Sequence, residues 1–417
     1  MIRIRSVAAA VAVISTAHPA GALEPVPLTE LLRFAAEHAP AVELAQHRRQ
    51  GGGAAELSAG ALLWHNPSVE LALGPRLGAP GEAGLDFSAS LTQPVEVFGQ
   101  RGLRQEAAAR LGERLEAELR LARWQSRREV TLAYRLAQVA GERLALAERA
   151  LAFSDETART TGRRLAAGDA TAIEVQVAAV DRAAAEQARL TAEEERAIAR
   201  IHLAQVAGWP ISAPPEVQAG LAPPRPVPAL AAVLEVALGH HPELEARRAA
   251  VAEATLHIAL NEREAWPAPA LGIAVSREGS SPERYSVLGT LGVALPLWRR
   301  GQGERRAAEV EASLARAEES VTAQALESRI AQAQVTLAAA AARLELYATR
   351  VAPSLEGGLA LLRRGFQAGE LPLLTVTAAR ERFFAAEQAA LTAYAEYYRA
   401  QAELELAAGS ELSGGAP

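Results

Sequence analysis

The stretch "SLTQPVEVFGQRG", residues 90–102, decides the fold because it joins two kinds of secondary structure. Before Pro94, apolar and polar residues alternate as in a β-strand; after Gly99 the chain continues as a charged, alanine-rich run typical of a helix. The stretch "GVALPLWRRGQG", residues 292–303, repeats this arrangement some 200 residues later. The sequence therefore predicts, twice, a strand joined directly to a long helix.

The sequence contains an internal duplication that covers most of the chain. Pro40 and Pro242 stand 202 positions apart. The same offset relates Trp64 to Trp266, Pro67 to Pro269, Pro94 to Pro296, Gly99 to Gly301 and Gln100 to Gln302. Further along the offset becomes 201, which pairs Gly168 with Gly369 and Glu186 with Glu387. Repetition at one spacing indicates two structural copies, which we place at residues 23–209 and 229–408, with a proline-rich connector at 210–228 and a flexible tail at 409–417.

The N-terminus has the pattern of an export signal. Arg3 and Arg5 precede a short apolar run, and Ala20 and Ala22 supply the small residues before a cleavage point. We predict a signal peptide over residues 1–22; the alternative is a buried N-terminal helix. With no cysteine in the chain, we expect neither disulfides nor a lipid anchor. There is no apolar run of 18 residues, so any entry into a membrane is expected through strands.

The composition favours elongated helical packing. Of 417 residues, 50% are apolar but only 4% are aromatic, and alanine supplies much of the apolar share, which suits close helix contacts better than a thick globular core. The net charge of -6 gives no basic surface for nucleic acid. We therefore expect no nucleic-acid partner.

The sequence patterns of the two copies predict the same order of elements. A first helix covers 28–63 or 229–265, a β-hairpin covers 67–93 or 269–296, and a long helical hairpin covers 97–208 or 303–408. In the hairpins, apolar residues alternate with small polar ones, the pattern of a transmembrane strand. A soluble, half-buried hairpin would alternate in the same way.

Four strands per chain cannot close a barrel, because the smallest membrane barrels have eight and lipid does not tolerate open edges. Several chains must then pool their strands, and the long helical hairpins would continue the pore as a tunnel. The fold class predicted is mainly α, with internally duplicated helical hairpins forming an α-barrel tunnel and four transmembrane β-strands per chain.

At this point the sequence resembles a known family. The duplicated unit, the "SLTQPVEVFGQRG" stretch, the opening "LRFAAEHAPAVELAQ" and its copy "VLEVALGHHPELEARR" are similar to outer-membrane efflux proteins of the TolC type, closest in look to the CzcC and CusC branch. The resemblance covers about residues 28–408. It implies a homotrimer with a twelve-stranded barrel in outer-membrane lipid and a helical tunnel across the periplasm. It also implies a periplasmic adaptor and an inner-membrane transporter, often of the resistance-nodulation-division class, as partners.

The resemblance also implies two functional regions. In the family, the turn at 163–174 and its copy at 363–375 lie at the periplasmic tip, where the pore closes and the adaptor docks. The candidate residues there are Arg163, Arg164, Gly168, Glu174, Arg363, Arg364, Phe366, Gly369 and Thr375. Thr375 stands where the family commonly has an aspartate, which weakens the case for a carboxylate ring from the second copy. The candidate barrel-to-tunnel junction comprises Pro94, Phe98, Gly99, Pro296, Trp298 and Gly301. Ordinary turn and helix-end chemistry would explain the same tip residues.

The sequence gives little support for an enzyme or for a metal-binding protein. His240 and His241 are adjacent, but no HExxH motif or cysteine accompanies them. The "GQRG" and "RRGQG" stretches lack the spacing and the lysine of a phosphate-binding loop. We predict no catalytic residue, no resident metal and no cofactor.

The leading hypothesis is a passive export duct of a tripartite pump, for metal cations or for drugs and other small toxic compounds. One alternative is the outer-membrane duct of a type I protein secretion system. A second, from a different class, is a periplasmic coiled-coil adaptor or scaffold, although an adaptor would not repeat its hairpin together with paired strands.

Overall fold

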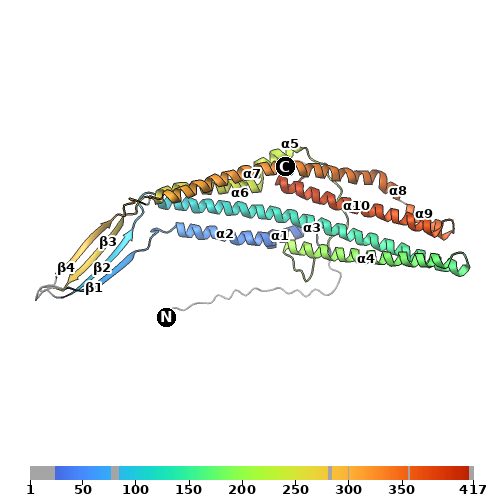
Figure 1. Ribbon diagram of the computed structural model, residues 1–417, viewed down its shortest axis with the longest axis horizontal. Helices are drawn as coiled ribbons and strands as arrows, with labels where there is room; N and C mark the ends of the chain where they lie inside the picture. Colours follow the sequence, from blue (N-terminus) through green and yellow to red (C-terminus); the bar gives the residue numbers. More distant parts are fainter. Residues whose placement is uncertain (1–23, 77–83, 280–283, 299, 356, 413–417) are drawn as a thin grey trace.

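A computed structural model describes residues 24–76, 84–279, 284–298, 300–355 and 357–412. The molecule is elongated, with a four-stranded sheet at one end and the turns of two long helical hairpins at the other (Figure 1). The predicted signal peptide (1–22) and most of the predicted tail (409–417) lie outside the described residues.

The elements follow the same order in both halves of the chain. The first half contains α1 (Leu28–His38), α2 (Pro40–Ala59), β1 (Ser68–Arg76), β2 (Gly84–Pro94), α3 (Gln100–Ala167) and α4 (Ala172–Ala207). The second contains α5 (Leu230–His240), α6 (Pro242–Glu264), β3 (Ala270–Glu278), β4 (Arg284–Gly292), α7 (Gln302–Leu346), a π-helical turn η1 (Tyr347–Val351), α8 (Ala352–Leu355), α9 (Gly358–Gln367) and α10 (Leu373–Ala408). The predicted strand–helix junctions are therefore present in both halves.

The prediction of one continuous helix at the start of each copy is wrong. Pro40 and Pro242 are the first residues of α2 and α6. The residues before them, Ala39 and His241, are extended, with ψ angles of 136° and 127°. A proline ring clashes with a helical conformation of the preceding residue, so each predicted helix is divided in two.

The first arm of the helical hairpin predicted over 303–408 is not one continuous helix either. α7 ends at Leu346 and passes into the π-helical turn, in which the N–H of Ala352 donates to the carbonyl of Tyr347. Pro353 follows directly and has no N–H to give to the α-helical ladder. Gly357, with φ of 75°, then separates α8 from α9.

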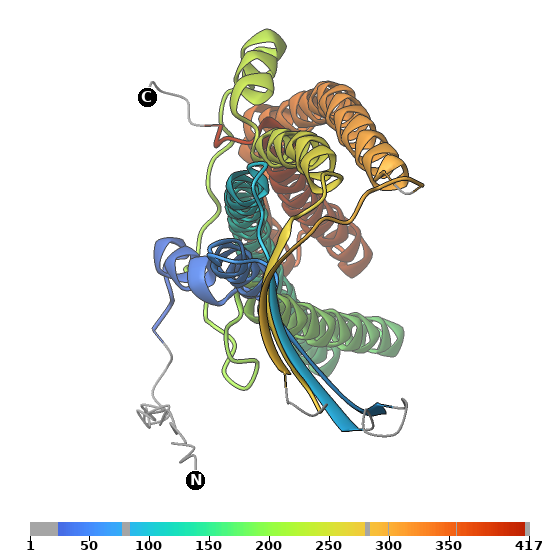
Figure 2. The same ribbon diagram turned by 90° about the vertical axis from the view of Figure 1, so that its left-hand side faces the viewer.

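The four strands form one antiparallel sheet in the order β1-β2-β3-β4. β2 of the first half pairs with β3 of the second, with Leu91 opposite Ile273. The sheet is thus made jointly by both copies, and it is curved (Figure 2). β1 and β4 are its two outer strands.

A glycine triplet in α2 allows two helices to approach closely. A Cβ on Gly52 would lie 3.3 Å from the Cα of Gly112 in α3, whereas Gly51 and Gly53 face open space. The close packing of α2 on α3 explains the second glycine of the triplet.

The connector at 210–228 lies against buried tyrosines of the long helices. Tyr134 of α3 donates to the carbonyl of Val26 (3.0 Å) and accepts from the N–H of Gln218 (3.1 Å). Tyr397 and Tyr398 of α10 bond to the backbone of residues 225 and 222. These contacts hold the proline-rich connector along the middle of the molecule.

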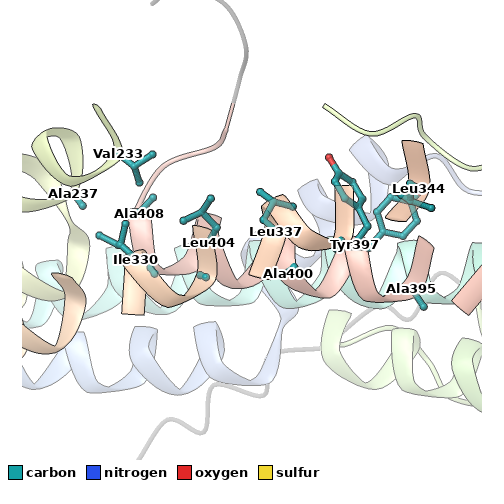
Figure 3. Packing of buried hydrophobic residues seen from close by; sticks show 14 of the residues in the cluster. Val233, Ala237, Ile330, Leu337, Leu344, Ala395, Tyr397, Ala400, Leu404 and Ala408 are labelled. Carbon is teal, nitrogen blue, oxygen red and sulfur yellow. The ribbon is translucent and has the colours of Figure 1, made fainter. Parts of the chain in front are cut away.

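The largest apolar cluster joins α5, α7 and α10 in this middle region. Figure 3 shows Leu337 of α7 and Leu404 of α10 within this cluster, with Tyr397 and Leu344 farther along. A smaller cluster packs α1 and α2 on α3 and α4. Among the described helices, none combines the length and the apolar content that crossing a bilayer requires.

Candidate functional site: the strand–helix junction and the helical tips

The junction after each hairpin is built by a glycine followed by a glutamine. Gly99 and Gly301 have φ angles of 82° and 70°, which non-glycine residues rarely adopt. The side-chain oxygen of Gln100 accepts from the N–H of Phe98 (2.9 Å), and that of Gln302 accepts from the N–H of Arg300 (2.8 Å). The Gly-Gln pair thus turns the chain and closes the turn at the start of α3 and α7.

A buried ion-pair network secures the first junction. The guanidinium of Arg104, whose side chain is 9% exposed, lies 2.7 Å from Glu96 and 3.3 Å from Glu264 of α6. Its carbon is 3.8 Å from the ring centre of Trp64. Because a buried charge is costly unless it is paired, these contacts fix the segment after β2 relative to α3 and α6. We name this the Arg104 network (Arg104, Glu96, Glu264 and Trp64).

At the second junction, the described residues do not form a matching network. Trp298 stands where the first copy has Glu96, and it is 88% exposed. Pro296 lies four residues beyond the end of β4, whereas Pro94 is the last residue of β2. Of the predicted junction residues, the structure brings Phe98 close to Trp266, with ring centres 5.1 Å apart. Sequence reasoning missed Arg104 and Glu264, because neither belongs to a local motif; Glu96 lay inside the quoted stretch but had no evident partner.

The first tip is a helix–turn–helix closed by a capping box. Gly168, with φ of 85°, ends α3, and Thr171 caps α4. The hydroxyl of Thr171 accepts from the N–H of Glu174 (3.2 Å), while the Glu174 carboxylate accepts from the N–H of Thr171 (2.7 Å). The backbone N–H and the hydroxyl of Thr171, with Arg164 nearby, hold the pKa of Glu174 below its ordinary value. Glu174 therefore has a structural partner at the tip.

The second tip uses different chemistry. Gly369 has φ of 79°, and Pro372 precedes α10 without any side-chain cap. Thr375 is exposed, and its N–H donates to the carbonyl of Pro372 (3.1 Å). The carboxylate of a capping box is absent from this turn. The tips of the two copies are thus similar in backbone shape and different in charge.

An apolar cluster joins the two tips within one chain. Phe366 is 3% exposed and packs with Phe153, Ala178, Leu373 and Val376. The first two of these partners come from the first copy and the other two from the second. Phe366 therefore holds the two hairpins of one chain together near their ends.

The predicted arginines surround this cluster or remain at its edge. The guanidinium of Arg164 lies 5.5 Å from the ring centre of Phe366, and Arg363 pairs with Glu156 at 2.8 Å. Arg163 donates to the hydroxyl of Thr160 (3.2 Å). Arg364 is exposed. The structure brings Arg164, Arg363 and Phe366 together and leaves Arg364 and Thr375 apart from them.

His241 is a helix cap. Its Nδ1 accepts from the N–H of Glu243 (3.1 Å), and its Nε2 donates to the carbonyl of Leu406 (3.1 Å). Burial lowers its pKa, which favours the neutral ring that these two bonds require. Both ring nitrogens are occupied by backbone groups. Within the described residues, no three His, Cys, Asp or Glu side chains are grouped in a way that would hold a metal ion.

These features define a class of protein: an internally duplicated, channel-forming subunit in which a strand segment continues into long helical hairpins. The model of the family described as "Outer membrane efflux protein" matches residues 31–209 and again residues 233–410. The chain belongs to this outer membrane efflux protein family. It is an outer-membrane channel protein that exports compounds, and it is not an enzyme.

Individual relatives agree with this assignment. The cobalt-zinc-cadmium resistance protein CzcC of Cupriavidus metallidurans is 26% identical over 76% of each chain. The nickel-cobalt-cadmium resistance protein NccC of Alcaligenes xylosoxydans xylosoxydans is 36% identical over 32% of this chain and 31% of its own. The crystal structure of CusC superposes with a TM-score of 0.73 at 18% identity, covering 95% of this chain and 96% of CusC. The predicted resemblance to the CzcC and CusC branch is confirmed.

Proposed function

We propose that three copies of this chain form the passive duct of a tripartite efflux pump, with a twelve-stranded barrel in the outer membrane and a helical tunnel extending into the periplasm. The observation that carries this is the four-stranded sheet, which exposes a continuous apolar face and continues directly into two long helical hairpins. α3 alone, with 68 residues, is about 100 Å long. Open sheet edges are not stable in lipid, so β1 of one copy would pair with β4 of the next.

The helical tips are the proposed contact with a periplasmic adaptor, and through it with an inner-membrane transporter of the resistance-nodulation-division class. Ile173 at the start of α4 is 75% exposed, and Leu374 at the start of α10 is 70% exposed. They occupy matching positions in the two copies, so a trimer would present six similar apolar contacts. Arg163, Gly168, Arg364, Gly369 and the other predicted tip residues would frame these contacts. Residues 1–22 would direct export, and no lipid anchor would be needed.

Metal cations are the proposed cargo. The support is the similarity to CzcC and NccC, whose names state resistance to cobalt, cadmium, and zinc or nickel. The test is to delete the gene in its native host and measure growth in graded cobalt, zinc, cadmium and nickel, beside a panel of drugs. Loss of metal resistance, restored by the gene on a plasmid, is expected. Loss of drug resistance alone, or of a secreted polypeptide alone, would overturn the proposed cargo.

A matched pair of substitutions tests the membrane orientation of the sheet. Ile273 lies on the exposed apolar face of β3, and its neighbour Ala274 lies on the opposite face. Arginine on a lipid-facing strand position costs about 2–4 kcal/mol near the bilayer centre, and far less on the pore side. Ile273→Arg is therefore expected to abolish the heat-sensitive trimer in outer-membrane fractions, while Ala274→Arg keeps it. Equal behaviour of the two variants would contradict the proposed barrel.

A further inference from the structure

The strand register divides the sheet into two faces of different chemistry. Residues paired across antiparallel strands lie on the same face. Val69 pairs with Leu91, Leu91 with Ile273, and Leu271 with Leu291. These large side chains are 50–70% exposed. This is the apolar face that the proposed function places against lipid.

The opposite face, which we call the polar face, is small and almost uncharged along most of its length. One row across the sheet is Ser68, Thr92, Gly272 and Thr290, and another is Ala72, Ser88, Ser276 and Ser286. The hydroxyls of Ser276 and Ser286 bond to each other at 2.7 Å. Side chains of this size leave room for a water-filled passage.

Charges on the polar face occur at two levels. At the end distant from the helices, Arg76 pairs with Asp86 at 3.2 Å and with Glu278 at 3.3 Å, and Arg284 lies at the start of β4. At the middle of the sheet, the row between the two uncharged rows consists of Glu70, Ser90, Ala274 and Leu288. Among the described strand residues, Glu70 is thus the one charged residue of the polar face between its two ends.

The carboxylate of Glu70 is not neutralised. Among the described residues, no side chain forms an ion pair or a hydrogen bond with it. Arg76, the cation on the same strand, is six residues away, which is about 20 Å along a strand. That separation exceeds the screening length of about 8 Å at physiological salt.

We propose that Glu70 is a specificity-determining residue, whose carboxylate gives the strand segment of the passage a preference for cations over anions. The proposal rests on the proposed trimeric duct, in which three copies would place three such carboxylates in one ring. Rings of acidic side chains favour cations by electrostatic attraction in a narrow polar passage. Selection of cargo by charge would then take place in the strand segment, independently of any selection at the helical tips.

The absence of cysteine from the chain allows the local potential to be measured directly. Ser90 lies directly opposite Glu70 in the register, so their Cβ atoms are about 5 Å apart. A Ser90→Cys variant would carry a single thiol. Its reaction rates with two methanethiosulfonate reagents, one carrying trimethylammonium and one carrying sulfonate, give a ratio that reports the potential at this row. Any effect of Glu70 on thiol ionisation cancels in the ratio.

The ratio of cationic to anionic rates is expected to fall about tenfold when Glu70→Gln is added at low ionic strength, as Coulomb's law gives for a unit charge at this distance in water. Glu70→Lys is expected to reverse the preference. High salt is expected to shrink both differences. The matched control is Glu37→Gln, an exposed carboxylate of α1 far from the sheet, which should leave the ratio unchanged.

Two results would overturn the proposal. A ratio that is the same with glutamate and glutamine at position 70 removes Glu70 as a determinant, even where the variant channel still confers resistance and the proposed duct stands. Reaction at a Leu91→Cys thiol but not at a Ser90→Cys thiol would show that the polar face does not line the aqueous passage. Failure of the proposed function itself would appear differently, as loss of the trimer and of resistance in the unmodified chain.

Discussion

The long helix of the first copy and its counterpart in the second begin alike and then differ. Each starts at a Gly-Gln cap, but α3 continues for 68 residues, whereas the counterpart is divided into α7, a π-helical turn, α8 and α9. Pro353 and Gly357 stand where the first copy has Ala152 and Glu156. A single proline removes a helical hydrogen bond, so duplication has produced one continuous helix and one segmented helix.

The two strand–helix junctions also differ, because the first has more stabilising contacts than the second. The first is fixed by the Arg104 network, while the matching Arg306 of the second is exposed and, within the described part of the chain, pairs with Glu309, at 2.9 Å and three residues away. We therefore expect the first junction to be firmer than the second. The following predictions test this contrast, beginning with the largest effect.

Removing the buried arginine should damage the protein far more than removing its counterpart. Arg104→Met leaves Glu96 buried without a partner, and we expect it to lower the free energy of unfolding by about 3 kcal/mol. Arg306→Met should cost less than about 0.5 kcal/mol, because exposed pairs contribute little. Denaturant unfolding of the purified channel, followed by circular dichroism, measures both. Equal losses would show that the two junctions are equally firm.

Two glycines with positive φ differ in their surroundings: Gly208 packs against another segment of the chain, whereas Gly357 does not. A Cβ on Gly208 would lie 2.0 Å from the carbonyl oxygen of His38, while a Cβ on Gly357 would meet nothing within 4 Å. Gly208→Ala should therefore cost about 2–3 kcal/mol through clash and backbone strain, and Gly357→Ala only about 1 kcal/mol, from strain alone. Melting temperatures of the two variants decide this. A larger loss of stability from Gly357→Ala than from Gly208→Ala would contradict this expectation, because it would mean that Gly357 is the more tightly constrained of the two.

Restoring the missing hydrogen bond should make the second helix resemble the first. Pro353→Ala is expected to slow amide hydrogen exchange over residues 347–355 and to raise stability by about 1 kcal/mol, because the helical ladder becomes continuous. The control is the matching segment 146–154 of α3 in the same samples, whose exchange should not change. Fast exchange persisting after the substitution would place the cause of the break elsewhere than in Pro353.

The smallest effect concerns pH at the tips. The pKa of Glu174 is lowered in the folded protein by its bonds to Thr171, so its contribution to the first tip is present above the ordinary carboxyl pKa and is lost as pH falls through the lower folded value. A nitroxide on an Ala170→Cys variant should become more mobile once the pH has fallen below the ordinary glutamate pKa of about 4.3, towards the lower folded value. The label on an Ala368→Cys variant, beside the uncapped second tip, should not respond in this way.

Glutamine at position 174 provides the matched control for this pH effect. Glu174→Gln keeps an acceptor for the capping box but cannot titrate, so the acid-induced mobility at Ala170 should disappear. Mobility that still rises in acid would assign the change to another carboxylate.

The sequence by itself determined the features that depend on neighbouring residues. Alternation of apolar and small polar residues predicted the strands, the positive-φ glycines 99, 168, 301 and 369 marked the turns, and the constant offset revealed two copies. These signals are local, because strand faces and turn geometry follow from a few consecutive residues. Pro40 and Pro353 are local signals too. The prediction followed the long apolar and alanine-rich patterns around them and therefore missed both helix breaks.

Only the tertiary structure decided which distant residues meet. Arg104 is 160 residues from Glu264, and Phe366 contacts Phe153 across the two copies. The pairing of β1 with β2, and of β2 with β3, placed Glu70 in a row whose other members, Ser90, Ala274 and Leu288, are uncharged. Such contacts depend on how the two copies pack together, because burial and pairing of charges are properties of the assembled elements and are not encoded in any short stretch of the chain.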